Sequence, residues 1–222
     1  FEGNIGLIGQ LPKGEFKDVG VTTGFGLDLN FIYNPVDNLG FGINLGGSVY
    51  DISTREIPFS YYSDLITITE ETKNGIFHGH LFFKINPLKG RIKPYMEGLI
   101  GFKNLQTNTR LYNQNCTDNP DTEWDDCEIA SSTNASDTAL SYGCGFGLEV
   151  LLTTFEKEPN SSEGKLSFFI NGRFLWGGEA EYLKEGDIEF SNPEDGPVQT
   201  TFHWNKSKTD LLQISIGVSI LI

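Results

Sequence analysis

Apolar and polar residues alternate along most of this chain, and the alternation is clearest in its last twelve residues. From Leu212 to Ile222 every second residue is apolar and mostly β-branched, and the residues between them are small or polar until Leu221. A period of two places these two sets on opposite faces of a β-strand. A soluble sheet would pack the apolar face on a core, whereas a membrane barrel would turn that face to lipid.

Seven further stretches alternate in the same way, and helical periodicity is weak throughout, so the sequence predicts eight strands. Turn signals such as Asn34-Pro35 and Asn86-Pro87 separate some of them. The strands are expected at about 3–11, 21–33, 39–52, 65–85, 92–106, 140–154, 166–177 and 211–222.

The connections between these strands differ in length. Links after the second, fourth and sixth strands are short or middling, at 34–38, 86–91 and 156–165, whereas those after the third, fifth and seventh are long and polar. Long structureless loops are uncommon inside compact domains. Confined to one end of a meander, they are typical of a membrane barrel with short periplasmic turns and long outer loops. An even number of strands then puts both termini on the periplasmic side.

The polar face of the strands favours a membrane barrel over a soluble one. It is rich in glycine, which weakens a solvent-facing strand but suits a wall that curves around a narrow interior. A lipocalin-like or avidin-like soluble cup would have to turn this face outward. The polar face also carries charges on many strands, which can pair inside the barrel, and Arg173 should lie there within reach of Glu97 or Glu149. The predicted lumen network comprises Asp28, His78, His80, Lys84, Lys93, Glu97, Lys103, Glu149 and Arg173.

Composition narrows the class further. The chain has 222 residues, a net charge of −14 and a sequence pI of about 4.5, which argues against binding nucleic acid or anionic lipid headgroups. No apolar run approaches the length of a membrane helix. The chain begins at Phe1 rather than Met, which fits a mature exported protein or, alternatively, a trimmed chain. We therefore expect one domain, 1–222: an all-β, eight-stranded antiparallel up-and-down transmembrane β-barrel.

Three cysteines are present. Cys116 and Cys127 bracket a short acidic stretch and are predicted to form a disulfide, since the outer loops would lie in an oxidising compartment. Cys144 should stay free and face lipid from the sixth strand. The stretch from Cys116 to Glu128 holds six acidic residues and no basic one, so its oxygens could bind Ca²⁺, but the spacing matches no known calcium loop and a solvated loop is the favoured interpretation.

The chain also resembles the small outer-membrane β-barrel proteins of Bacteroidota. The resemblance covers essentially the whole chain and is carried by segments 9–16, 24–27, 39–43, 93–98, 141–147 and 177–183, which read GQLPKGEF, GFGL, LGFGI, KPYMEG, SYGCGFG and GGEAEYL. It implies an outer-membrane location. Many such barrels are accessory subunits of larger outer-membrane assemblies, so the resemblance implies partners more than chemistry. The chain departs from the usual terminal aromatic residue, since it ends at Ile222.

Catalytic and metal-binding patterns are sparse. His78 and His80 share a strand face and could bind a metal, but no third ligand is spaced to help, so membership of the interior network is favoured. No Gly-x-Ser-x-Gly motif is present. Glu97 and Glu149 could form a carboxylate pair, although Arg173 or Lys103 offer simpler partners. We expect no catalytic residue, cofactor or metal.

The leading interpretation is a non-enzymatic accessory subunit of an outer-membrane complex, in protein secretion, surface display or nutrient uptake. Its partners would be outer-membrane lipids and other outer-membrane proteins or lipoproteins, not nucleic acid. Rival interpretations are a narrow transport or ligand-binding barrel, which would show steady conductance, and a lipid-modifying enzyme, which lipid analysis of a deletion strain would detect. Aromatic residues in the long outer loops are expected to bind a partner, because protein interfaces are enriched in aromatic residues. The alternative is that these residues only pack the loops together above the barrel. Candidate partner-binding residues are Phe59, Tyr61, Tyr62, Tyr182, Phe190, Phe202 and Trp204.

Overall fold

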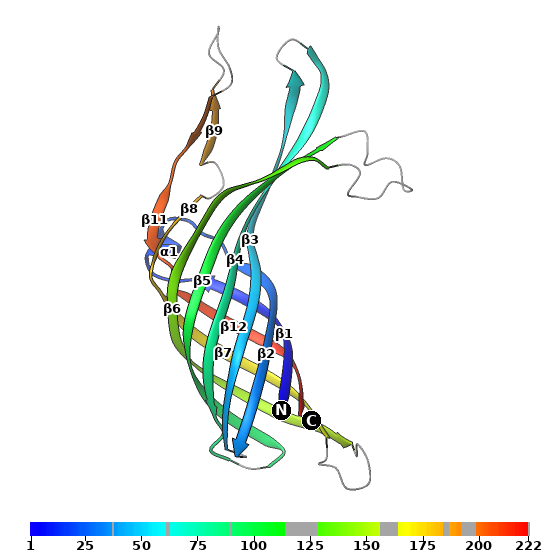
Figure 1. Cartoon of the computed structure of the whole chain (residues 1–222), viewed down its shortest axis with the longest axis vertical. Coiled ribbons are helices and arrows are strands. Elements are labelled where there is room, and N and C mark those ends of the chain that lie inside the picture. The colour runs from blue at the N-terminus through cyan, green and yellow to red at the C-terminus, as the bar shows by residue number, and fades with distance from the viewer. Residues whose placement is uncertain are drawn as a thin grey trace.

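Eight antiparallel strands close into a barrel in which each strand pairs with its neighbours along the chain and the first pairs with the last (Figure 1). The computed structural model describes residues 1–36, 38–60, 63–88, 90–113, 128–155, 164–183, 187–191 and 199–221. The predicted up-and-down barrel is confirmed. Its strands are β1 Glu2–Pro12, β2 Gly24–Val36, β3 Leu39–Ser60, β4 Ser63–Ile85, β5 Ile92–Asn113, β6 Glu128–Phe155, β7 Gly164–Gly177 and β12 Leu211–Leu221.

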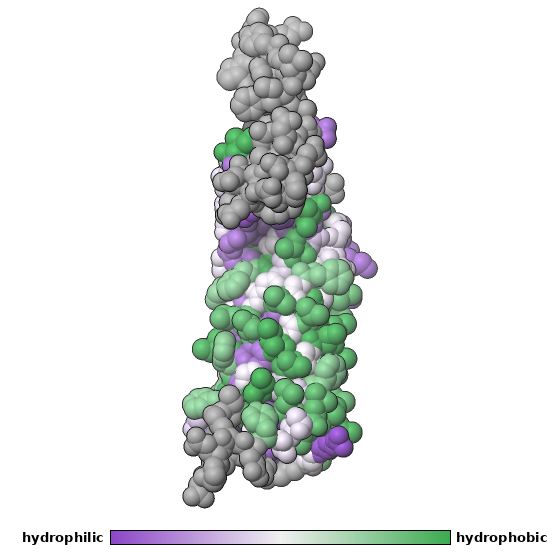
Figure 2. Space-filling model, turned by 90° about the vertical axis from the view of Figure 1, so that its right-hand side faces the viewer, coloured by the Kyte–Doolittle hydropathy of each residue, from purple (hydrophilic) through white to green (hydrophobic). Residues whose placement is uncertain are grey.

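The two faces of the barrel wall have opposite character. Large apolar side chains on all eight strands of the barrel point outward and are exposed, for example Leu27, Ile100 and Phe146. On the face that Figure 2 shows, apolar side chains gather over the barrel. Charged and polar side chains of the alternate positions are buried inside. A soluble barrel has the reverse arrangement, whereas a barrel in hydrocarbon needs this one and also satisfies every backbone group of its wall. The chain is therefore a transmembrane β-barrel, and the soluble cup is excluded.

Both termini lie at the same end of the barrel as the short connections between strands (Figure 1). Among the described residues, no helix is long and apolar enough to span a membrane.

Three strands, β3, β5 and β6, are longer than predicted, whereas β4 agrees with its expected range of 65–85. Strands β3 to β6 continue past the barrel as a four-stranded sheet, here called the extension (Figure 1). The third and fifth strands were expected to end at 52 and 106 and the sixth to begin at 140, and these three limits were wrong. Outside hydrocarbon neither face of a sheet must be apolar, so the alternation disappears from the sequence. Polar side chains on its inner face bond to one another instead, as in Asn74 Nδ2 to Asp51 Oδ2 (2.9 Å) and Thr107 Oγ1 to Asn74 Oδ1 (2.6 Å).

The mouth of the barrel, where the extension begins, is covered by structured connections. A four-residue helix, α1 Glu15–Asp18, lies in the link expected at 12–20. The link expected after the seventh strand contains two small sheets, β8 Glu179–Tyr182 with β11 Asn205–Lys208 and β9 Ile188–Ser191 with β10 Gln199–Phe202. Phe16 of α1 is fully buried, with its ring 5.2 Å from that of Tyr182. The apolar cluster around it includes Val21, Tyr50, Leu175, Ala180 and Leu211.

Close packing of β2 on β3 requires glycine at position 26. A Cβ atom there would overlap the carbonyl oxygen of Gly47 and the Cα of Ser48, whereas a Cβ at Gly172 meets nothing within 4 Å. We predict that Gly26→Val lowers the free energy of unfolding by about 1–3 kcal/mol, the usual range for overpacking, or prevents assembly. Gly172→Val is the matched control and should fold like the parent. Heat-modifiable mobility on SDS gels would measure the folded fraction, and equal behaviour of the two variants would contradict this packing argument.

Candidate functional site

Arg173 of β7 is the centre of the lumen. Its Nε donates to Glu97 Oε1 (2.5 Å), its Nη1 to Asp28 Oδ2 (3.1 Å) and its Nη2 to Asn30 Oδ1 (3.1 Å). All four side chains are buried. Since Glu97 lies on β5 and Asp28 on β2, one guanidinium connects three strands across the interior. Of the two partners expected for Arg173, the structure pairs it with Glu97.

A second charged group lies nearer the termini. Lys84 Nζ donates to Glu2 Oε1 (2.9 Å) and to Glu149 Oε2 (3.1 Å), and the amine stands 4.6 Å from the ring centre of Tyr95. Glu2 was not among the predicted lumen residues, because the first strand was expected to start one residue later. Its position two residues before Asn4, on the polar face, is the signal that would have found it.

The two lumen histidines bond to the network from neighbouring positions. His78 Nε2 lies 3.1 Å from Asp28 Oδ1, and its Nδ1 lies 3.3 Å from Gln10 Nε2. His80 Nε2 lies 2.9 Å from Ser141 Oγ. No group of three or more potential metal ligands occurs in the described part of the chain. Through these hydrogen bonds both histidines are part of the polar filling of the lumen.

Ser141, His80 and Asn44 are arranged in the order of a hydrolase triad. His80 Nδ1 lies 3.3 Å from Asn44 Oδ1, opposite its contact with the Ser141 hydroxyl. A nucleophile, a base and an orienting group need this geometry. They also need a substrate within reach, and all three side chains are buried in the filled lumen. The contacts therefore act as structural hydrogen bonds between β3, β4 and β6.

Two predicted members of the network behave differently. Lys103 is fully buried, but its amine donates to the backbone oxygens of Leu175 (3.3 Å) and Thr209 (2.5 Å) rather than to a carboxylate. The expectation that Lys103 could pair with Glu97 or Glu149 was wrong, because Lys103 lies at the mouth. Lys93 is half-buried and forms no ion pair or hydrogen bond with a described residue.

The aromatic residues beyond the mouth divide into two sets. Tyr182 is buried, packs edge to face against Phe16 and bonds through its hydroxyl to Ser207 Oγ (2.8 Å), and burial raises its pKa. Its predicted role in partner binding was wrong, because it packs the mouth. Phe202 and Trp204 are 38% and 53% exposed, with ring centres 6.2 Å apart. Outside the described part lie the side chains of Phe59, Tyr61, Tyr62 and Phe190 and the segment 114–127, which holds Cys116, Cys127 and the acidic stretch.

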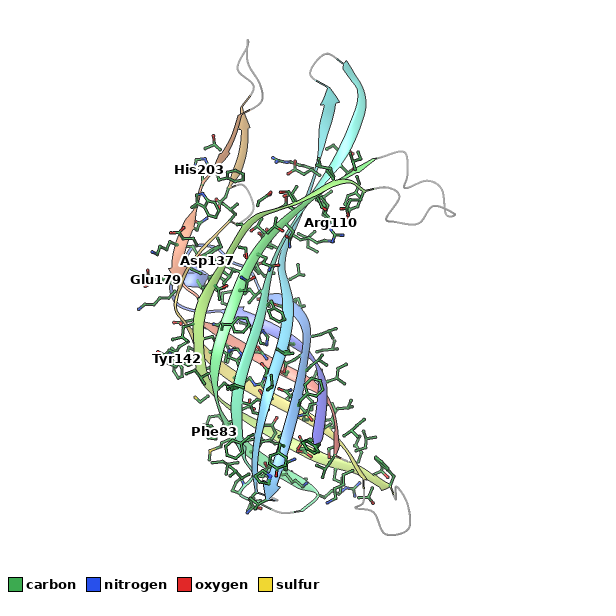
Figure 3. The ribbon with its side chains drawn as sticks, viewed as in Figure 1. Phe83, Arg110, Asp137, Tyr142, Glu179 and His203 are labelled. Atoms are coloured by element: carbon green, nitrogen blue, oxygen red, sulfur yellow. The ribbon has the colours of Figure 1, made fainter. Side chains whose placement is uncertain are left out.

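Net charge is concentrated at the end of the molecule away from the termini. The chain has 30 acidic and 16 basic residues. Segments 13–23, 51–76, 104–140 and 178–210, which join or extend the strands at that end, contain 22 of the acidic and eight of the basic residues and thus the whole net charge of −14. The remaining eight acidic and eight basic residues cancel. Asp137, Glu179 and Arg110 mark this region in Figure 3.

An apolar groove lies on the outer wall over β3 to β6. Its lining includes Leu45, Leu81, Ile100, Phe102 and Leu140, and Gly79 forms part of its floor. Phe83 and Tyr142 lie on the same barrel wall (Figure 3). Because this wall faces hydrocarbon, the groove is in contact with the acyl chains of the membrane. We therefore do not assign it a catalytic or ligand-binding role.

These features define a class of protein: a transmembrane β-barrel of the outer-membrane type whose lumen is filled by paired charges and whose mouth is closed by an apolar cluster. Cys144 is free and exposed on the outer wall.

Three solved outer-membrane barrels are similar to this chain. Neisserial surface protein A has 10% identity and a TM-score of 0.43, with coverage of 100% of this chain and 96% of that one. The attachment invasion locus protein Ail of Yersinia pestis has 16% identity and a TM-score of 0.37, with coverage of 98% of this chain and 97% of that one. The N-terminal β-barrel domain of Pseudomonas aeruginosa OprF has 10% identity and a TM-score of 0.31, with coverage of 98% of this chain and 96% of that one. No family model and no curated protein matches the sequence. The class assignment therefore rests on the wall and lumen of this chain.

The Arg173 network generates a stability prediction. Arg173→Ala leaves Glu97 and Asp28 buried without their cation, so we expect the free energy of unfolding to fall by about 3–5 kcal/mol. Arg110→Ala is the control, because its ion pair with Glu128 (3.7 Å) is exposed and should matter little. Denaturant titration followed by tryptophan fluorescence would measure both. A small effect of Arg173→Ala would contradict a pairing role for this residue.

Proposed function

We propose that this protein is a non-enzymatic barrel of the bacterial outer membrane that acts as an accessory interaction subunit of a larger outer-membrane complex. Such complexes serve protein secretion, surface display or nutrient uptake. In this proposal the termini and short turns face the periplasm and the extension projects outside the cell. The observation that carries it is the contrast between a closed lumen and a large acidic structure beyond the mouth. The resemblance to barrels of Bacteroidota favours the same role.

The filled interior speaks against the two rival functions. A transport barrel needs a path, but here Lys84, Arg173 and their carboxylates occupy the lumen and Phe16 packs into the mouth. A lipid-modifying enzyme needs a nucleophile that its substrate can reach, and the Ser141 hydroxyl is buried. The surface that remains for function is therefore the extension and the hairpin formed by β9 and β10.

Phe202 and Trp204 are the described aromatic residues best placed to bind a partner. Both are exposed beyond the mouth, and rigid exposed aromatic pairs are typical anchors of protein interfaces. The backbone N–H of the adjacent His203 donates to Asp187 O (2.8 Å), which closes the base of the hairpin. Residues 188–202 can therefore be replaced by an Asn-Gly turn without separating the ends.

The proposed outside location also supports the Cys116–Cys127 disulfide. We predict that peptide mapping of protein from native membranes without reductant finds these two cysteines linked and Cys144 free, because extracellular loops lie in an oxidising environment. Mapping after reduction is the control. A linkage of Cys144 to either of the other cysteines would contradict both the pairing and the outward position of Cys144.

The test of the proposed function is isolation from native membranes. Extraction in mild detergent followed by mass spectrometry should recover the barrel with other outer-membrane proteins or lipoproteins. Replacing residues 188–202 by the turn, or the double change Phe202→Ser and Trp204→Ser, should reduce the recovered partner at least several-fold. Leu88→Ser is the matched control, because Leu88 is a similarly exposed apolar residue at the opposite end.

The folded state of each variant is checked by its mobility on SDS gels before extraction. If the parent protein purifies alone in every detergent, and the hairpin replacement changes nothing, the proposed function is wrong.

A further inference from the structure

The upper part of β6 has a free edge. Strand β6 pairs with β5 from Glu128 to Val150, but it pairs with β7 only from Ser141 onward. A single backbone bond, from Gly178 N to Leu140 O (2.8 Å), follows at the mouth. Above it no described strand pairs with the outer edge of β6, and the hairpin of β9 and β10 rises separately (Figure 1). Residues 129–133 on this edge are exposed among the described residues.

The opposite edge of the extension is protected, and this one is not. Strand β3 also loses its outer neighbour, since its pairing with β2 begins at Val49. Along its free edge stand Arg55 and Glu56, and Pro58 has no N–H to donate. Charges and proline are the usual devices that stop a sheet edge from pairing. The edge of β6 from Ile129 to Thr133 reads Ile-Ala-Ser-Ser-Thr and contains neither.

A short regular stretch of this edge is suited to pairing. Residues Ala130–Thr133 pair one by one with Leu111–Asn108 of β5, between register shifts that leave Ile129 and Asn134 without partners. The four residues of this stretch are exposed. Their side chains are small, so a second strand can approach without a clash. The two irregularities limit a ladder on this edge to a short segment.

The charges around this stretch favour a basic partner. Asp137 and Glu181 lie at its lower end, where Glu181 N donates to Asp137 Oδ2 (2.8 Å). Glu128 lies at its upper end, and its ion pair with Arg110 is long and exposed. A cationic chain is attracted to such a surface, and a second copy of this protein is repelled.

We propose that the free edge of β6 at residues 130–133 is a docking site for an extended segment of a partner polypeptide that contains Lys or Arg and adds to the extension as a further strand. This inference rests on the proposed function and names its site. Backbone hydrogen bonds supply the affinity, as in other cases of strand addition, and the acidic surroundings select the charge.

The test uses two peptides and the full chain in detergent micelles. The first probe is a fluorescent eight-residue peptide of alternating Lys and Val, and the second is the same peptide N-methylated at every second residue. N-methylation keeps the charge but removes donors along one edge. We expect the first peptide to bind about tenfold or more tightly than the second by fluorescence anisotropy, since the loss of two or three backbone bonds has that effect. Equal binding would overturn the proposal, because charge alone would then explain it.

Proline substitutions locate the site. Adjacent residues of a strand direct their N–H groups to opposite sides, so either Ser131→Pro or Ser132→Pro removes a donor from the free edge. One of these two substitutions should abolish the difference in affinity between the two peptides. Thr54→Pro on the protected edge of β3 is the matched control and should leave it unchanged. Hydrogen exchange should show peptide-dependent protection within 130–133, and protection on β3 instead would overturn the assignment.

The docking site on β6 and the proposed function can fail independently of each other. If the edge proline leaves partner recovery from native membranes unchanged while the hairpin replacement abolishes it, the edge assignment is wrong and the proposed function stands. If no partner is recovered from the parent protein, the proposed function fails whatever the peptides do. Concentration-dependent cross-linking of the barrel through β6 would replace the basic partner with a second copy and overturn the choice of occupant.

Discussion

The structure depends on one constraint: the charged side chains buried inside the barrel must be neutralised there, because the wall is a single layer of strands. Hydrocarbon surrounds the barrel, so the charges at the middle of the inner face are stabilised by partners across the lumen. Arg173 meets Glu97 and Asp28, and Lys84 meets Glu2 and Glu149. Each cation thus joins carboxylates from two other strands. The pairs also hold the register, because a slip by one residue would turn the charges toward lipid.

The glycines of the inner face are the counterpart of these long side chains. A Cβ at Gly46 would lie 2.5 Å from the His78 ring and 2.8 Å from Asp28 Oδ1, and a Cβ at Gly145 would lie 2.8 Å from Glu97 Oε1. Glycine therefore makes room for the network rather than only allowing the wall to curve. The interior of an eight-stranded barrel is just wide enough for side chains, so large residues require small ones opposite them.

The sequence predicted the barrel well because lipid and lumen impose opposite demands on adjacent residues. That contrast placed Asp28, His78, Lys84 and Arg173 inside and Cys144 on the outer wall, where the structure has them. It could not pair Lys84 with Glu2, since pairing across the lumen depends on shear and not on periodicity. It also could not show that Tyr182 is buried, because its neighbour Phe16 comes from a helix too short to have a pattern. The extension was hidden because a sheet in water needs no apolar face.

The barrel and the segments beyond its mouth differ in net charge, and only the neutrality of the barrel is required by the membrane. The barrel and its turns must be close to neutral, because net charge next to hydrocarbon is costly, and eight acidic residues there match eight basic ones. No such requirement holds beyond the mouth, where solvent screens charge. The surplus of acidic residues there is not a consequence of the fold. It is the feature of this molecule that the membrane does not explain, and it is the feature on which the proposal of a cationic partner rests.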